Sequence, residues 1–174
     1  MKRLALIAIV LVLLAAPAFA QFRLDVGIIV PRGLGTTSGA TSEGSFVSDW
    51  PFIPLPEAGL YYQGDLGLVK LGIGARAFSF ILETILWPNA YAELDFGRFA
   101  VQAQFGGGAF AMFGLANSTS TGNVFIPDLS AWFKLGKERN LRLGGGIVGL
   151  DVPSVFGSDM PFLLYFGGKL SVIL

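Results

Sequence analysis

The segment Phe162–Leu174 reads FLLYFGGKLSVIL, and its chemical character alternates from one residue to the next. Every second residue from Phe162 is apolar or glycine, whereas the residues between them include Tyr165, Lys169 and Ser171. A two-residue period with two unlike faces is typical of a β-strand. The segment therefore predicts a strand that is long enough to cross a bilayer, since a tilted strand needs about 9 to 11 residues to do so.

The same alternation recurs along the rest of the chain. Pro31 is predicted to end the first strand, and the Gly-, Ser- and Thr-rich segment 31–54 is predicted to be a long loop. The apolar segment 79–88 leaves three alternatives open, namely strand extension, a short helix or a lid. The strands predicted before the last one cover residues 22–30, 55–63, 66–78, 89–96, 99–113, 124–135 and 141–150.

The predicted connections are of two kinds. Short turns follow the second, fourth and sixth strands at 63–65, 95–98 and 136–140, and longer loops follow the other strands. Eight strands with this spacing predict an antiparallel up-and-down barrel with both chain ends on the short-turn side. Short turns on one side and longer loops on the other are typical of barrels of the bacterial outer membrane.

The first twenty residues, MKRLALIAIVLVLLAAPAFA, have the features of a secretory signal peptide. Lys2 and Arg3 precede an apolar run over 4–16, and Ala18-Phe19-Ala20 is a cleavage pattern, so cleavage is expected after Ala20. An uncleaved membrane anchor is disfavoured because the run is shorter than the 18 or so residues of a spanning helix. The remaining chain, 21–174, is expected to be one domain.

Composition excludes several classes of function. Removing Lys2 and Arg3 from twelve basic and twelve acidic residues leaves a net charge of −2, which does not favour nucleic-acid binding. The chain has no cysteine and no histidine. Disulfides, Cys- or His-based metal sites and Ser-His-Asp catalysis are therefore excluded, and the sequence predicts neither an enzyme nor a cofactor.

The polar faces of the predicted strands carry six basic and five acidic side chains together with many glycines. An exterior with so few charges would be poorly solvated, and each Arg or Lys facing lipid would cost about 2 to 4 kcal/mol. We therefore expect the polar face inside, where an eight-stranded barrel is filled by side chains and buried charges must pair. The predicted lumen network consists of Arg23, Asp25, Glu57, Lys70, Arg76, Glu93, Asp95, Asp128, Lys134, Arg142 and Lys169.

Glu93 and Asp95 lie on one face of a strand, and a pair of carboxylates can support two-acid chemistry. Pairing with lumen Arg and Lys is the favoured interpretation. Aromatic residues are predicted to form two interfacial girdles, with Trp132 as a misfit on the polar face. The girdle residues are Phe22, Tyr62, Phe96 and Phe99 at the short-turn ends, and Trp50, Phe52, Trp87, Phe113, Phe125 and Phe162 at the loop ends.

In this architecture the chain resembles the small eight-stranded outer-membrane barrels, the group of the OmpA transmembrane domain, OmpX and OmpW-like proteins. The resemblance covers 21–174 and is most specific in the last strand, through Phe162, Phe166, Leu170 and Val172. It implies outer-membrane lipid and the barrel-assembly machinery, through that strand, as partners. The chain departs from the group by ending in Leu174 rather than in an aromatic residue.

Three functions remain open from the sequence. The favoured one is a non-enzymatic outer-membrane barrel with a filled lumen, which serves envelope structure or surface interaction through its outer loops, foremost 31–54. The second is a narrow channel or a carrier of small, possibly apolar solutes, with 80–87 as a lateral lid. The third is a soluble periplasmic binder similar to a lipocalin, with the apolar face inside.

Overall fold

The computed structural model describes residues 20–38, 45–47, 53–80, 82–115, 117–151 and 159–174. These residues form an all-β structure, and none of their segments is a helix that could span a membrane. The strands are β1 (Ala20–Ser38), β2 (Ser45–Val47), β3 (Leu55–Asp65), β4 (Val69–Phe80), β5 (Glu83–Asp95), β6 (Phe99–Gly114), β7 (Ser118–Leu135), β8 (Leu141–Gly149) and β9 (Asp159–Ile173).

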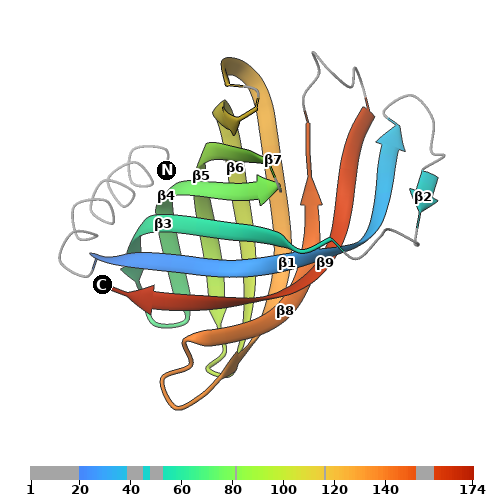
Figure 1. Cartoon of the computed structure of the whole chain (residues 1–174). Coiled ribbons are helices and arrows are strands. Elements are labelled where there is room, and N and C mark those ends of the chain that lie inside the picture. Colours follow the sequence, from blue (N-terminus) through green and yellow to red (C-terminus); the bar gives the residue numbers. More distant parts are fainter. Residues whose placement is uncertain (1–19, 39–44, 48–52, 81, 116, 152–158) are drawn as a thin grey trace, which may run out of the picture.

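The long strands close into a barrel (Figure 1). From β3 to β9 each strand pairs antiparallel with the next, β3 also pairs with β1, and the ring closes where β1 pairs with β9, from Arg23↔Ile173 to Ser38↔Asp159. The three-residue β2 pairs only with the far end of β1. The eight-stranded antiparallel up-and-down barrel predicted from the sequence is confirmed, including the role of its last strand in closing the ring.

The prediction that Pro31 ends the first strand was wrong, because β1 continues to Ser38. Its pairing with β9 shifts register between Pro31 and Gly33 and then continues from Leu34 to Ser38. Proline has no N–H to donate to a ladder and is tolerated in a strand at such an irregularity. Residues 39–44 and 48–52 of the predicted loop lie outside the described residues.

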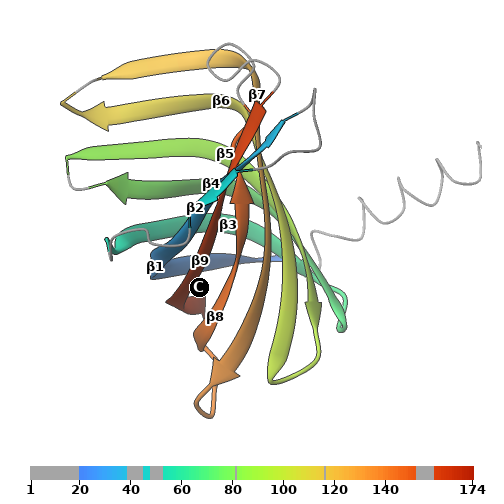
Figure 2. The same cartoon turned by 90° about the vertical axis from the view of Figure 1, so that its right-hand side faces the viewer.

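Two of the expected long loops are instead the tips of hairpins (Figure 2). The open segment 79–88 extends β4 and β5, which pair up to Phe80↔Glu83. The expected polar loop over 114–123 is largely strand, because β7 begins at Ser118 and pairs with Met112 of β6. Thr side chains favour strands, and the alternation of 79–88 continues that of its neighbours. The barrel is therefore asymmetric through the overhang of its strands as well as through its loops.

Two of the turns at the other end share one sequence pattern, Asp-x-Gly. The carboxylate of Asp65 accepts a hydrogen bond from the N–H of Gly67 at 2.8 Å, and that of Asp95 accepts one from Gly97 at 2.9 Å. Both glycines have φ above +80°, a conformation that side-chain-bearing residues rarely adopt. The pattern therefore predicts where these two hairpins reverse. We call this the turn end of the barrel, and the opposite end the outer end.

The polar face of each strand points into the barrel, and the apolar face points outward. Arg23 is 1% exposed and Glu93 is completely buried, whereas Leu129 on the outer face is 59% exposed. This distribution is the reverse of that of a soluble barrel, in which the apolar face forms the core. It leaves an exterior made largely of Leu, Ile, Val, Phe and Ala side chains.

Glycines on the inward face make room for large side chains from neighbouring positions. A Cβ at Gly72 would overlap the ring of Tyr91, and a Cβ at Gly59 would overlap the ring of Tyr61. The two tyrosine rings meet edge to face at 5.0 Å. The packing of the two tyrosine rings in the lumen therefore depends on the absence of a side chain at these glycines.

Gly72→Ala tests this packing. We expect it to lower the free energy of unfolding by about 1 to 3 kcal/mol, because the Tyr91 ring must move out of a filled space. The matched control is Gly64→Ala on β3, where an added Cβ has no heavy atom within 4 Å and the change should be within about 0.5 kcal/mol. Urea titration of the refolded barrel measures both, and equal effects would contradict the packing argument.

Candidate functional site

The inward side chains change in character along the barrel, from charged at the turn end to apolar at the outer end. On β4 the inward positions run from Lys70 through Arg76 to Phe78, and on β7 they run from Lys134 to Ile126. The lumen therefore has a charged half and an apolar half. It is the candidate functional site.

At the turn end, two lysines share the carboxylate of Asp95. Lys70 Nζ lies 2.9 Å from Asp95 and 3.3 Å from Asp65. Lys134 pairs with Asp95 and lies 3.8 Å from Oε1 of Glu93, deeper in the lumen. Asp65 was not part of the predicted network, because the strand alternation that assigns a side chain to one face does not extend into a turn. This group connects the exposed turns to the buried charges.

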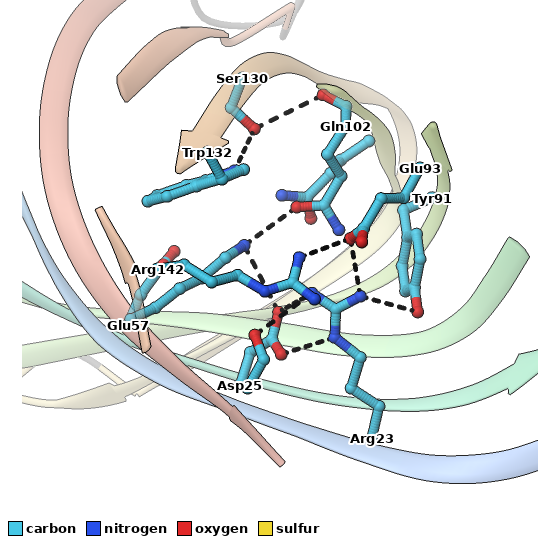
Figure 3. Close-up of polar contacts among 12 residues, drawn as sticks. Arg23, Asp25, Glu57, Tyr91, Glu93, Gln102, Ser130, Trp132 and Arg142 are labelled. Atoms are coloured by element: carbon cyan, nitrogen blue, oxygen red, sulfur yellow. Dashed lines mark hydrogen bonds and ion pairs between the residues drawn. The ribbon is translucent and has the colours of Figure 1, made fainter. Parts of the chain in front are cut away.

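The central network comprises Arg23, Asp25, Glu93, Arg142 and Lys169, and Figure 3 shows four of its members meeting in the lumen. Arg23 donates to both oxygens of Asp25, at 2.7 and 2.8 Å, and to Glu93 Oε2 at 2.9 Å. Arg142 donates to the same Glu93 oxygen at 2.7 Å. Lys169 Nζ lies 3.4 Å from Asp25. One carboxylate on β5 thus joins cations from β1 and β8 across the lumen.

Neutral groups complete the central network. Arg23 also donates to Tyr91 and to Gln63, both at 3.2 Å, and Lys169 donates to Gln102 at 2.9 Å. The Lys169 ammonium lies 4.3 Å from the centre of the Trp132 ring. Trp132, the misfit of the sequence analysis, is therefore a lumen side chain that faces a buried cation.

A separate outer cluster lies towards the apolar half. Arg76 donates to Glu57 at 2.8 Å and to Asp128 at 2.6 Å, which ties β4 to β3 and to β7. The Tyr165 hydroxyl donates to Asp128 at 2.8 Å. Two carboxylates thus share one arginine, and Glu57 Oε1 is buried without a hydrogen-bond partner among the described residues.

The structure brings together all eleven residues of the predicted network, since each has an oppositely charged group within 4 Å. Glu93 and Asp95 face different main partners, Arg23 and Arg142 for the first and Lys70 and Lys134 for the second. They do not form one two-acid site. No cluster of three or more potential metal ligands occurs in the described part of the chain.

A neutral hydrogen-bonded group was missed by the sequence analysis. Asn89 Nδ2 donates to Gln104 Oε1 at 2.7 Å, and the Tyr61 hydroxyl donates to the same oxygen at 3.3 Å. All three side chains are at least 95% buried. The strand alternation places them inward, but only charge was used to select the predicted network.

Beyond the outer cluster lies a cavity of about 340 Å³, which we call the outer cavity. Apolar residues of every barrel strand except β6 line it, and its wall residues include Leu55, Phe78, Trp87, Ile126, Val148 and Leu163. These positions lie an even number of residues from the lumen charges of their strands. The same period that predicts the charged half could therefore have predicted the apolar half.

The girdle prediction was wrong for Trp87, which is 3% exposed and lines the outer cavity. The strand continues through 83–88, so Trp87 lies six residues from Glu93 and faces inward with it. Phe162 also lines the cavity. Trp50 and Phe52 lie outside the described residues. The predicted girdle residues that lie exposed are Phe22, Tyr62, Phe96, Phe99, Phe113 and Phe125.

Fold and lumen together define the class of structure, an eight-stranded barrel with a polar, ion-paired interior and an apolar exterior. No protein-family model matches the chain, and no curated protein matches its sequence. Among solved structures, Neisserial surface protein A (NspA) matches at 11% identity and a TM-score of 0.47, over 87% of this chain and 97% of that one.

Two further solved structures are similar at a lower score. The attachment invasion locus protein Ail of Yersinia pestis matches at 7% identity and a TM-score of 0.38, over 88% of this chain and 99% of that one. The N-terminal β-barrel domain of OprF from Pseudomonas aeruginosa matches at 9% identity and a TM-score of 0.38, over 85% and 97%. The fold assignment itself rests on the strand pairing of this chain.

Glu93→Gln tests the central network. We expect it to lower the free energy of unfolding by about 3 to 5 kcal/mol, because Arg142 loses the carboxylate that it pairs with and Arg23 keeps only Asp25. Glu138→Gln in the exposed turn between β7 and β8 is the matched control, with an expected change within about 0.5 kcal/mol. Urea titration at pH 7 compares them, and a stable Glu93→Gln variant would mean that the pairing contributes little to the fold.

Proposed function

We propose that this chain is an integral barrel of the outer membrane, exported with a signal peptide that is cleaved after Ala20. Residues 1–19, on which the export prediction rests, lie outside the described residues. The observation that carries the proposal is the inverted distribution of polarity. Charged side chains such as Arg23, Glu93 and Arg142 are buried in the lumen, while outward Leu129, Phe133 and Ile147 are 46 to 59% exposed.

Aromatic pairs at the turn end support a membrane boundary there. Phe22 and Tyr62 meet edge to face at 5.5 Å, and Phe96 and Phe99 stack at 6.4 Å, all of them exposed on the outer surface. Aromatic side chains are enriched where a barrel meets the lipid headgroups. The C-terminal strand β9, which closes the ring, is the part that we propose the barrel-assembly machinery recognises.

The favoured role is non-enzymatic, in envelope structure or in surface interaction through the outer end. The central network supports it, because Glu93 joins Arg23 and Arg142 across the lumen and all three side chains are buried. Every residue of the network already has a charged partner, which leaves no group poised for acid-base work. The hairpins of β4–β5 and β6–β7 would present the surface for a partner.

A second candidate role is the binding or carriage of a small apolar solute, and the outer cavity favours it. Its volume of about 340 Å³ falls within the range of ligand pockets, which are mostly lined by apolar side chains. The central network lies beneath the cavity, towards the turn end, and would stop a solute there. Of the two forms of the second function, a narrow channel or a carrier of small solutes, the channel is therefore the less favoured.

Leu129→Lys tests the position of the membrane. We expect it to lower the free energy of unfolding in lipid vesicles by about 2 to 4 kcal/mol, because the ammonium would face hydrocarbon. Leu66→Lys is the matched control, since Leu66 is 58% exposed but lies in a turn, outside the lipid. The folded fraction after urea treatment is read from the mobility of unboiled and boiled samples on a gel. Equal effects of the two variants would contradict the membrane assignment.

Bilayer conductance tests the closed lumen. We expect the unmodified protein to give no steady ion current in a planar bilayer, because the central network fills the charged half. Combined Arg23→Ala, Glu93→Ala and Arg142→Ala should allow ions through by removing the cross-lumen pairs together. Ile147→Ala on the outer face is the control, with no current expected. Steady current through the unmodified protein would overturn the filled-lumen proposal.

A further inference from the structure

Arg32 is the one cation on the outward face of the described strands. The other cations of these strands face the lumen, and each has a carboxylate within 4 Å. Arg32 is exposed, has no such partner among the described residues, and lies with its guanidinium 5.5 Å from the centre of the Phe166 ring. Phe166 is itself exposed on the outward face of β9. The outer surface therefore carries a positive charge that no described group neutralises.

The register shift in β1 accounts for the direction of this side chain. β1 pairs Pro31 with Tyr165 and then Gly33 with Leu164, so Arg32 is the extra residue of a bulge. Pro31 lines the outer cavity, and its neighbour Arg32 points to the opposite side of the strand. A bulge is a common means of re-aiming one side chain. The bulge thus places a cation on an otherwise apolar face.

Arg32 also lies at the height where the hydrocarbon of a membrane would end. Phe22, in the aromatic pair at the turn end, precedes it by ten residues on the same face of β1. Ten residues span about 33 Å along a strand, and about 25 Å along the axis of a barrel whose strands tilt by about 40°. That height equals the apolar band of an outer-membrane barrel. The outward residues between the two are all apolar, namely Leu24, Val26, Ile28 and Val30.

An apolar groove of about 820 Å³ runs along the outward face from Arg32 towards the turn end. We call it the β1–β9 groove. Phe166 and Val30 are its lining residues nearest the outer end, so the arginine stacks on one end of it. Gly168 has no side chain and lies between Phe166 and the groove residue Leu170 on the outward face of β9, which lowers the middle of the groove. Other outward side chains of its wall are Val26, Ile28, Leu141 and Leu143.

We propose that Arg32 and the β1–β9 groove bind one membrane lipid, with the lipid phosphate at Arg32 and an acyl chain in the groove. The lipid belongs to the leaflet at the outer end of the barrel. A guanidinium can donate two parallel N–H bonds to phosphate oxygens. This inference rests on the membrane location proposed above and adds a lipid class to it.

Charge and shape together select a phosphate-bearing lipid. An anionic headgroup compensates the unpaired charge of Arg32, and the stacking on Phe166 holds the guanidinium without using its N–H donors. A free phosphate would use the cation but leave the groove empty. A lipid without phosphate would fill the groove but leave the cation unpaired. Only a lipid with both parts matches the whole surface.

The test compares phosphatidic acid with diacylglycerol of the same acyl chains, using ¹⁵N-labelled barrel in micelles of an uncharged maltoside detergent. Such micelles contain no phosphate of their own. The side-chain Nε–H signal of Arg32, identified by its loss in Arg32→Gln, reports the headgroup, and the backbone amides of Gly168 and Leu170 report the groove. We expect saturable binding of both lipids, with phosphatidic acid about five- to tenfold tighter and the Arg32 signal moving only with it.

Variants separate the headgroup contact from the groove. Arg32→Gln removes the charge and should weaken phosphatidic acid to the affinity of diacylglycerol, which stays unchanged. Arg98→Gln is the matched control, because Arg98 is also exposed but lies in the turn between β5 and β6, and it should alter neither affinity.

Gly168→Leu fills the groove and should weaken both lipids. An added Cβ there would lie 2.9 Å from Cδ2 of Leu143, the end of a flexible side chain. Arg32→Gln alone decides the matter if Gly168→Leu does not fold.

Each outcome of the comparison has one meaning. Tighter binding of phosphatidic acid that is lost in Arg32→Gln and kept in Arg98→Gln supports the lipid site. Equal affinity for both lipids, or equal loss in the two arginine variants, overturns it. Inorganic phosphate that moves the Arg32 signal as tightly as phosphatidic acid also overturns it, in favour of a free anion. These results leave the membrane location in place, whereas a chain that stays folded in solution without detergent would overturn that location itself.

Discussion

The structure depends on the pairing of charges that have no access to water. Glu93 is completely buried, and its Oε2 accepts hydrogen bonds from Arg23 at 2.9 Å and from Arg142 at 2.7 Å. Each of these ions would be strongly destabilising alone, because its desolvation is repaid only by close partners. The strands that carry them can therefore close in only one arrangement, with the polar faces inward and the apolar faces outward.

The same constraint divides the lumen in two. In the charged half, ion pairs and the neutral groups around them connect strands across the lumen. In the apolar half no ion could be compensated, so residues such as Phe78, Trp87 and Ile126 form the wall and enclose a cavity. The outer cluster of Arg76, Glu57 and Asp128 is the boundary between the halves. An ion barrier beneath an apolar cavity fits a binding role better than a conducting one.

The irregular positions of the barrel lie in its outer half. The β1–β9 ladder shifts at Pro31, and the β5–β6 ladder shifts beside Trp87. Trp87 Nε1 and Asn89 Oδ1, two buried atoms without a hydrogen-bond partner among the described residues, lie at the second of these shifts. The charged half has no such register shift among the described strands, but buried side-chain atoms without a hydrogen-bond partner occur there too, on Glu93, Gln102 and Arg142. Departures from local rules of this kind are most often found where a protein binds something.

The sequence by itself determined the strands, their faces and the closed ring, because a two-residue period assigns each side chain to one side of a sheet. It also selected the charged residues of the lumen. Only the tertiary structure decided their partners, since Arg23 meets Glu93 from 70 positions away, across the ring rather than along the ladder. The tertiary structure likewise decided that 79–88 continues as strand, and the Trp87 side chain therefore points into the lumen. Periodicity is a local property, whereas register and contact across the lumen depend on the whole barrel.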